Sequence, residues 1–243
     1  MWPDALVLVV SVIAGGIAAV TGFGIGSLLT PLLALQVDTR LAVAAVSIPH
    51  VIGTALRLWL LQGGVDRRVL LSFGFTSAAG GLAGAALHGW ASNRWLTVVF
   101  GALLLFAAAS EVSGLARRMR FHGSVAWIAG AVSGLLGGLV GNQGGIRSAA
   151  LLGFNLSKQT FVGTATAIGL FVDGARMPVY LMMQYDDIRA MWPWVALATL
   201  GVTSGTVLGS RVLVRIPPVW FRRVLALILA VLGGAMLLRG IRP

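Results

Sequence analysis

The stretch AAVTGFGIGSLLTPLLAL, residues 18–35, decides the fold of this chain. Glycine stands at positions 22, 24 and 26 and proline at position 31, inside a run that is otherwise mostly apolar. A helix that crosses a bilayer needs about 20 consecutive apolar residues, and glycine and proline both disfavour an uninterrupted helix. The stretch therefore predicts a helix that breaks inside the membrane.

The composition indicates an integral membrane protein. Of the 243 residues, 58% are hydrophobic and 10% are charged, and the mean hydropathy is +0.92, so a soluble domain could not hide its apolar residues from water. We expect one all-α polytopic domain with the lipid bilayer as a partner. The chain has no cysteine, and we expect no cofactor, no metal site and no catalytic residue. The formal charge of +11 fits basic residues that orient helices and predicts no nucleic-acid binding.

An internal repeat divides the chain. A shift of 119 residues places Gly22 on Gly141, Gly26 on Gly145 and Arg57 on Arg176. Glycines match by chance in a glycine-rich chain, but an arginine inside a membrane helix is rare. We predict a first membrane repeat over 1–115, a basic cytoplasmic linker over 116–124 and a second, inverted repeat over 125–243.

Each predicted repeat holds three full spans and one interrupted segment. The interrupted segments, 5–37 and 125–157, each consist of a helix, a glycine break and a piece too short to cross. Either segment is a re-entrant hairpin or a broken helix that crosses. The full spans are expected at 41–62, 69–90, 96–114, 160–181, 191–213 and 220–238.

The distribution of Lys and Arg favours the hairpin. If both interrupted segments return to their own side, the basic loops 63–68, 116–124 and 214–219 share one side of the membrane; if the segments cross, this bias largely disappears. Three spans per repeat then insert the second repeat upside down, as is typical of secondary transporters. The basic loops are predicted to be cytoplasmic and the C-terminus after Leu238 periplasmic.

The two hairpin tips are predicted to form an anion site near the bilayer midplane. The short helix after each tip begins with free N–H groups and the positive end of its dipole, and Thr21, Ser27 and Ser148 are expected to cap these ends. Glycines that serve only close helix packing are the alternative. The predicted substrate-binding residues of the tips are Gly22, Gly24, Gly26, Ser27, Asn142, Gln143, Gly144, Gly145, Arg147 and Ser148.

Four further residues with acidic or basic side chains lie within the predicted spans 41–62 and 160–181, where a buried charge is costly. Arg57 and Arg176 are expected to bind substrate, with snorkelling to an interface as the alternative. Asp173 lies three residues before Arg176, which favours an ion pair within one helix; the other hypothesis is that Asp173 couples a proton. His50 is predicted either to hydrogen-bond within the bundle or to relay that proton.

Both glycine segments resemble those of the TauE/SafE sulfite-exporter family of membrane permeases. The similarity is carried by GFGIGSLLTPLLAL at 22–35 and GLLGGLVGNQGGIRSAALLGFNLSKQTFVGTATAIG at 134–169, and it extends over the whole chain. It implies transport of sulfite or an organosulfonate across the bacterial inner membrane. Asn142, Gln143 and Arg147 depart from the simpler pattern of the first half and leave the identity of the anion open.

We therefore expect a secondary transporter for a small sulfur oxyanion and not an enzyme. A potential that is negative inside favours outward movement of an anion by about 2.3 kcal/mol per charge per 100 mV, so export needs no coupling ion. An anion channel is the alternative. An intramembrane hydrolase built on Ser133 or Ser204 with His50 or His88 is disfavoured, because neither serine has G-x-S-x-G spacing. A homo-oligomer is left open.

A single cysteine tests the predicted topology, since the chain has none of its own. We expect a cysteine in place of His122, within the basic linker, to be protected from a membrane-impermeant thiol reagent in intact cells and to react after lysis. Labelling in intact cells would contradict the cytoplasmic assignment.

Overall fold

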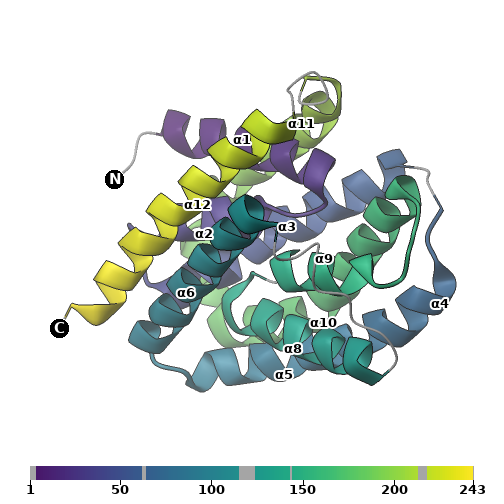
Figure 1. Ribbon diagram of the computed structural model, residues 1–243. Helices are drawn as coiled ribbons and strands as arrows, with labels where there is room; N and C mark the ends of the chain where they lie inside the picture. Colours follow the sequence, from purple (N-terminus) through teal and green to yellow (C-terminus); the bar gives the residue numbers. More distant parts are fainter. Residues whose placement is uncertain (1–3, 62–63, 115–123, 143, 213–217, 243) are drawn as a thin grey trace.

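The computed structural model describes residues 4–61, 64–114, 124–142, 144–212 and 218–242, and all regular structure in these ranges is helical (Figure 1). The all-α fold class is thereby confirmed. The first half contains α1 (Asp4–Thr21), α2 (Ile25–Ala34), α3 (Thr39–Leu61), α4 (Arg67–Val69), the π-helical turn η1 (Leu70–Gly74), α5 (Phe75–Trp90) and α6 (Asn93–Ser113). The second half contains α8 (Ser124–Val140), α9 (Gly144–Leu152), α10 (Lys158–Ala190), α11 (Trp192–Val212) and α12 (Pro218–Ile241).

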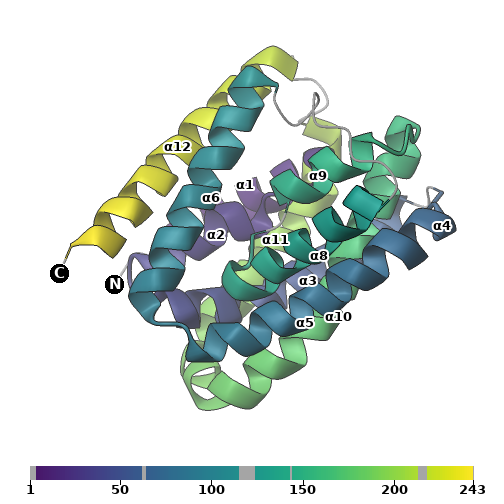
Figure 2. The same ribbon diagram turned by 60° about the horizontal axis from the view of Figure 1, so that its bottom comes forward.

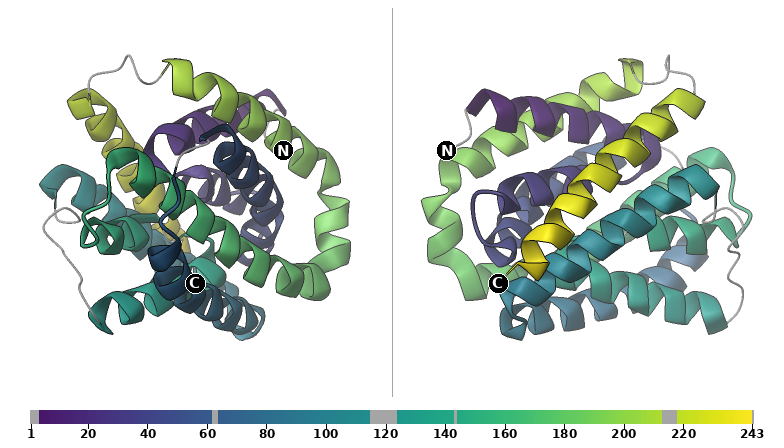
Figure 3. Two further views of the ribbon diagram at one scale, coloured as in Figure 1. Left: turned by 90° about the vertical axis from the view of Figure 1, so that its right-hand side faces the viewer. Right: turned by 60° about the vertical axis from the view of Figure 1, so that its left-hand side comes forward.

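Among the described residues, five helical segments are long and apolar enough to cross a membrane. The number rises to six if α10 and α11 together are counted as one span. These two helices meet at a bend of 101° (Figure 3). The helix predicted to end at residue 181 continues to Ala190 through a kink at Gln184, whose φ of −137° and ψ of 28° are not helical. The chain is a multi-pass membrane protein, and the separate crossing of α10 and α11 stays a prediction.

Both predicted breaks occur at the predicted glycines. α1 is followed by Gly22 (φ 83°) and α8 by Gly141 (φ 72°), and both residues lie in the left-handed region that glycine adopts without strain. Each N–H donates to the carbonyl four residues earlier, Gly22 to Ala18 and Gly141 to Gly137, both at 2.9 Å. These bonds close the C-terminal turn of each helix before the chain leaves it.

After the first break the chain reverses direction. Gly24 (φ 131°) lies against α1, where a Cβ on it would be 3.0 Å from Cγ2 of Ile17. The short helix α2 then packs against both α1 and α3, and in Figure 1 it runs back toward the side on which α1 begins. The first interrupted segment is therefore folded as a hairpin.

Three long helix pairs build the bundle, and each joins the two halves. α1 packs along α11, α5 along α8 and α6 along α12; the first pair lies at the top of Figure 1, the second at the bottom, and Figure 2 shows the third. In the predicted repeat α1 corresponds to α8, α5 to α11 and α6 to α12. Exchanging each helix for its counterpart therefore converts the first pair into the second and leaves the third unchanged. A two-fold relation would require this pattern, although the inverted repeat itself stays a prediction.

Glycines allow two of these pairs to approach backbone to backbone. A Cβ on Gly134 would lie 1.9 Å from the carbonyl oxygen of Ser77, across the α5–α8 contact. A Cβ on Gly205 would lie 2.0 Å from the carbonyl oxygen of Val12, across the α1–α11 contact. Away from the tips, glycine thus serves close helix packing, as small residues do in membrane bundles.

The connections between helices gather at two ends of the bundle. At one end Arg94 Nε donates to the carbonyl oxygen of Gly240 at 2.9 Å, so the start of α6 lies beside the end of α12. At the other end Asp66 N donates to Thr164 Oγ1 at 2.9 Å, so the loop after α3 lies beside the start of α10. Both termini lie on the same side of Figure 1. The topology and the end that faces the cytoplasm stay predictions.

We expect Gly134→Ala to destabilise the protein. The added methyl group would force α5 and α8 apart, because it would lie 1.9 Å from the Ser77 carbonyl oxygen, and overpacking of this kind costs about 1–3 kcal/mol. Gly234→Ala is the matched control, because a Cβ there meets no described atom within 4 Å and gains the same helix propensity. Thermal unfolding in detergent compares the two variants; equal midpoints would contradict the close helix contact.

Candidate functional site

The two glycine breaks touch each other. A Cβ on Gly26, in the first turn of α2, would lie 2.4 Å from the carbonyl oxygen of Gly141. A Cβ on Gly144, at the start of α9, would lie 2.4 Å from Cβ of Phe23. The first turn of each short helix therefore packs on the break of the other half. The two tips that the sequence predicted lie together, while Gln143 falls outside the described residues.

The predicted capping by Thr21 and Ser27 is wrong. The residue before α2 is Gly24, and α2 has no side-chain cap. Thr21 Oγ1 lies 2.9 Å from the carbonyl oxygen of Ile17 and 2.6 Å from that of Phe23, so this hydroxyl is used to close the turn.

Ser27 Oγ donates across the tips to Asn142 Oδ1 at 3.2 Å. Ser148 lies half-buried in α9, next to Arg147 in the sequence. The start of α2 is thus left without a hydroxyl acceptor for its N–H groups.

Arg147 lies at the centre of the two tips and is only partly bonded. Its side chain is 3% exposed, and Nη2 donates to the carbonyl oxygen of Gly22 at 3.3 Å. Within the part of the chain that the structure describes, Nε and Nη1 have no hydrogen-bond partner. Nη1 faces Gly169 of α10, where a Cβ would lie 2.9 Å away. Buried donors of a charged group without partners are costly, so a partner for these two nitrogens would stabilise the protein.

Two buried threonine hydroxyls, one beside Gly169 and one beside Gly141, are also unpaired in the part of the chain that the structure describes. Thr54 and Thr30 are buried, and their Oγ1 atoms have no partner among the described residues. Cγ2 of Thr54 would lie 3.7 Å from a Cβ on Gly169, and Oγ1 of Thr30 would lie 3.8 Å from a Cβ on Gly141. Thr54 shares a helix face with His50 and Arg57 at the spacing i, i+4, i+7, which is a signal in the sequence. Thr30 has no such signal, because only the folded hairpin brings it to the second tip.

Arg57 and Arg176 hold the ends of the first hairpin helices. Arg57 Nη1 donates to the carbonyl oxygen of Ala18 at 2.8 Å, and Arg176 Nη1 donates to that of Gly137 at 2.7 Å. Both arginines are buried, at 4% and 2% exposure, so snorkelling to an interface is wrong for both. Ala18 and Gly137 are themselves 119 residues apart, so the two bonds occupy equivalent positions in the predicted repeat.

α3 and α10 pack face to face, and polar side chains bond to one another along this contact. We call these side chains the polar ladder. His50 Nδ1 lies 2.7 Å from Asp173 Oδ2, and Arg57 Nε donates to Thr166 Oγ1 at 3.1 Å. Asp173 Oδ1 also accepts from Arg176, with Nη2 at 2.8 Å and Nε at 3.0 Å. The ion pair within α10 and the hydrogen bonding of His50 inside the bundle are therefore both confirmed. The sequence did not indicate that His50 and Asp173 bond to each other across the two halves.

Comparison with protein families assigns the chain to one family. The family described as Sulfite exporter TauE/SafE matches residues 7–236, a range that includes both glycine breaks and the helices α3 and α10. The chain belongs to the sulfite exporter TauE/SafE family. Comparisons with curated proteins and with solved structures gave no match. Since TauE/SafE proteins are transporters, the hydrolase alternative has no support.

The charges at the tips of this TauE/SafE protein are predominantly positive. Arg57, Arg147 and Arg176 each carry one positive charge, and Asp173 carries one negative charge. Among the described residues, no group of His, Cys, Asp and Glu is arranged to hold a metal ion. A positive cluster away from water favours a negatively charged ligand.

We expect Arg57→Gln to lower the stability of the protein. The variant loses the donors to Ala18 O and Thr166 Oγ1, and a buried group left without its partner costs about 1–3 kcal/mol. Arg57→Lys should recover little, because an ammonium lacks the planar fork that reaches both acceptors. Arg189→Gln, at an exposed position of α10, is the control. Unfolding in detergent with increasing SDS measures the effect; an unchanged midpoint for Arg57→Gln would contradict this role.

Proposed function

We propose that the protein is a secondary transporter that carries a small sulfur oxyanion, sulfite or an organosulfonate, across the bacterial inner membrane. Arg147 binds the anion between the two hairpin tips. The observation that supports this proposal most strongly is the pair of buried Arg147 nitrogens, Nε and Nη1, which have no partner among the described residues. A guanidinium edge that pairs Nη2 with either of these nitrogens matches an anion that carries two oxygens on one centre, because Nη2 keeps a second N–H beside the one it donates to Gly22 O.

The surroundings of Arg147 favour an anion further. The N-terminal turns of α2 and α9 lie against the opposite breaks, and the start of a helix carries a partial positive charge and unpaired N–H groups. The unpaired hydroxyl of Thr54, which like Arg147 lies beside Gly169, adds a donor. Arg57 and Arg176 contribute positive charge while their donors hold Ala18 O and Gly137 O. We therefore assign the anion to Arg147 and give Arg57 and Arg176 the role of holding the tips in place.

A carrier fits this arrangement better than a channel. Nε and Nη1 of Arg147 are closed off from solvent, and Gly26 packs directly on Gly141, so an ion bound to these nitrogens would have no open path along the tip contact. An enclosed site must open to each side in turn, as in transporters that work by alternating access. Counterflow exchange of a labelled anion separates the two cases, because only a carrier shows it.

Export is the direction that the membrane potential favours for an anion that moves alone, by about 2.3 kcal/mol per charge per 100 mV. The basic loops on the cytoplasmic side and the C-terminus on the periplasmic side complete the proposed orientation. The lipid bilayer and a small anion are the partners in this proposal.

We expect Arg147→Gln to weaken anion binding about ten- to a hundredfold, because a charge-assisted hydrogen bond contributes about 1.5–3 kcal/mol. Arg147→Lys, which keeps the charge without the fork, should fall between Arg147→Gln and the wild type. Isothermal titration of the purified protein with sulfite and with methanesulfonate measures both affinities.

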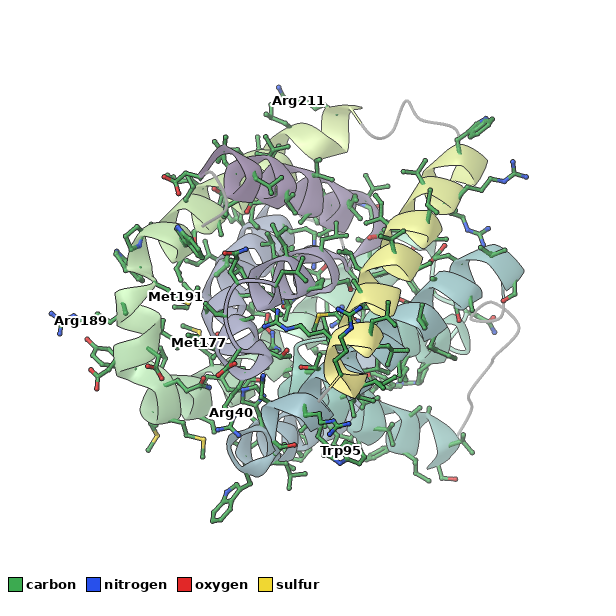
Figure 4. The ribbon with its side chains drawn as sticks, turned by 90° about the vertical axis from the view of Figure 1, so that its left-hand side faces the viewer. Arg40, Trp95, Met177, Arg189, Met191 and Arg211 are labelled. Atoms are coloured by element: carbon green, nitrogen blue, oxygen red, sulfur yellow. The ribbon has the colours of Figure 1, made fainter. Side chains whose placement is uncertain are left out.

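Arg189→Gln controls for the loss of one positive charge, since Arg189 extends from the end of α10 away from the bundle (Figure 4). Its affinity should equal that of the wild type. A folded Arg147→Gln protein with wild-type affinity for both anions would remove Arg147 from the site and contradict the proposal.

A further inference from the structure

We propose that His50 and Asp173 form a proton site coupled to the anion site, so that a proton travels with each anion. This inference rests on the proposed function, because it requires an anion at Arg147. It adds a second transported ion and changes the net charge that crosses the membrane.

The pair lies where the two halves meet. His50 Nδ1 is 2.7 Å from Asp173 Oδ2, with Asp173 1% exposed and His50 12% exposed. The first turn of α2 covers the imidazole, since a Cβ on Gly26 would lie 3.9 Å from His50 Cδ2. The second oxygen of Asp173 is held by Arg176. A histidine between a carboxylate and a helix N-terminus has a fixed orientation and can gain or lose one proton in place.

The pair also lies one helical turn from Arg147. Arg147 Nη1 faces Gly169, which is four residues before Asp173 on the same face of α10, a rise of about 6 Å. On α3, Thr54 follows His50 by the same four residues. An anion held by Arg147 and Thr54 would therefore lie about one turn along the ladder from the His50–Asp173 pair.

The predicted repeat makes these two positions equivalent. A shift of 119 residues places His50 on Gly169 and Thr54 on Asp173, so the His50–Asp173 contact corresponds to the contact between Gly169 and Thr54. One position holds a titratable pair, and in the other a glycine leaves space that the guanidinium of Arg147 occupies. The two halves thus place a proton site and an anion site at matching points of the ladder.

Electrostatics couples the two sites. The charged groups around His50 are Asp173 and Arg176 from α10 and Arg57 from its own helix, with Arg147 one turn away. The arginines keep their charge across the usable pH range, so His50 and Asp173 are the titratable members of this set. A negative ligand beside Arg147 offsets the surrounding positive charge and favours a protonated His50. By linkage, protonation strengthens anion binding by the same factor, typically about 5- to 150-fold.

A coupled proton sets the charge that moves. One proton with a monovalent sulfonate is electroneutral, whereas one proton with divalent sulfite leaves one net negative charge, whose export the membrane potential still favours. Methanesulfonate is therefore the sharper probe, because its charge does not change with pH and its transport should carry no current.

The experiment uses the full-length protein in proteoliposomes with a methanesulfonate gradient. Solid-supported-membrane currents report net charge, and an enclosed pH dye reports protons. For the wild type we expect a proton signal and no current, together with methanesulfonate binding about 5- to 150-fold tighter at acidic than at alkaline pH. For His50→Gln, which keeps a neutral hydrogen-bond donor to Asp173, we expect a current, no proton signal and an affinity that does not depend on pH.

His88→Gln is the matched control, because His88 is also buried but bonds to the carbonyl oxygens of Leu139 and Arg40, away from Arg147. It should behave as the wild type; if it loses the proton signal as His50→Gln does, the assignment to His50 is overturned. A wild-type current without a proton signal also overturns the coupling, even if His50→Gln does not fold. In that case, counterflow exchange of methanesulfonate would leave the proposed transport function standing. Absence of exchange for methanesulfonate and for sulfite would remove both.

Discussion

A backbone that breaks inside a bilayer must satisfy its own polar groups, and the rest of this structure depends on how that is done. α1 and α8 end before Gly22 and Gly141, and the carbonyl oxygens of Ala18 and Gly137 each accept two bonds there. One donor is the glycine N–H, and the other is an arginine of the next long helix. The hydrocarbon core of a bilayer offers no water that could replace such donors. The ends of α1 and α8 are therefore closed by two arginines buried inside the bundle.

Both halves satisfy the carbonyl at their break with a glycine N–H and an arginine. They differ in the side chains that lie next to that arginine. Asp173 neutralises Arg176 and bonds to His50. At the matching point of the ladder, Gly169 leaves the room in which Arg147 is buried with two unpaired nitrogens. The two halves thus carry different sets of charges at corresponding positions of the predicted repeat, with an excess of positive charge where the tips touch. That excess is the physical basis of the anion site that we propose.

The same contacts limit how the protein can move. Gly26 packs on Gly141 with no space for a methyl group, so under the proposed function the tips would have to separate to release the anion. Arg57 of α3 bonds to α1, and Arg176 of α10 bonds to α8. The His50–Asp173 bond joins the two long helices α3 and α10. A proton and an anion at this junction would both act on the contact that has to open. Binding and conformational change would then share one set of residues.

The sequence by itself determined the membrane class, the position of both breaks and the identity of the ionisable residues, because hydropathy, glycine and intramembrane charge are local properties of the chain. The tertiary structure decided which of those residues meet. Arg57 and Arg176 bond to hairpin carbonyls, Thr21 and Ser27 do not cap α2, and α10 extends to Ala190 through a kink at Gln184. The partners of a buried polar group come from helices distant in the sequence, and helical periodicity gives the face of a side chain but not the helix packed against it.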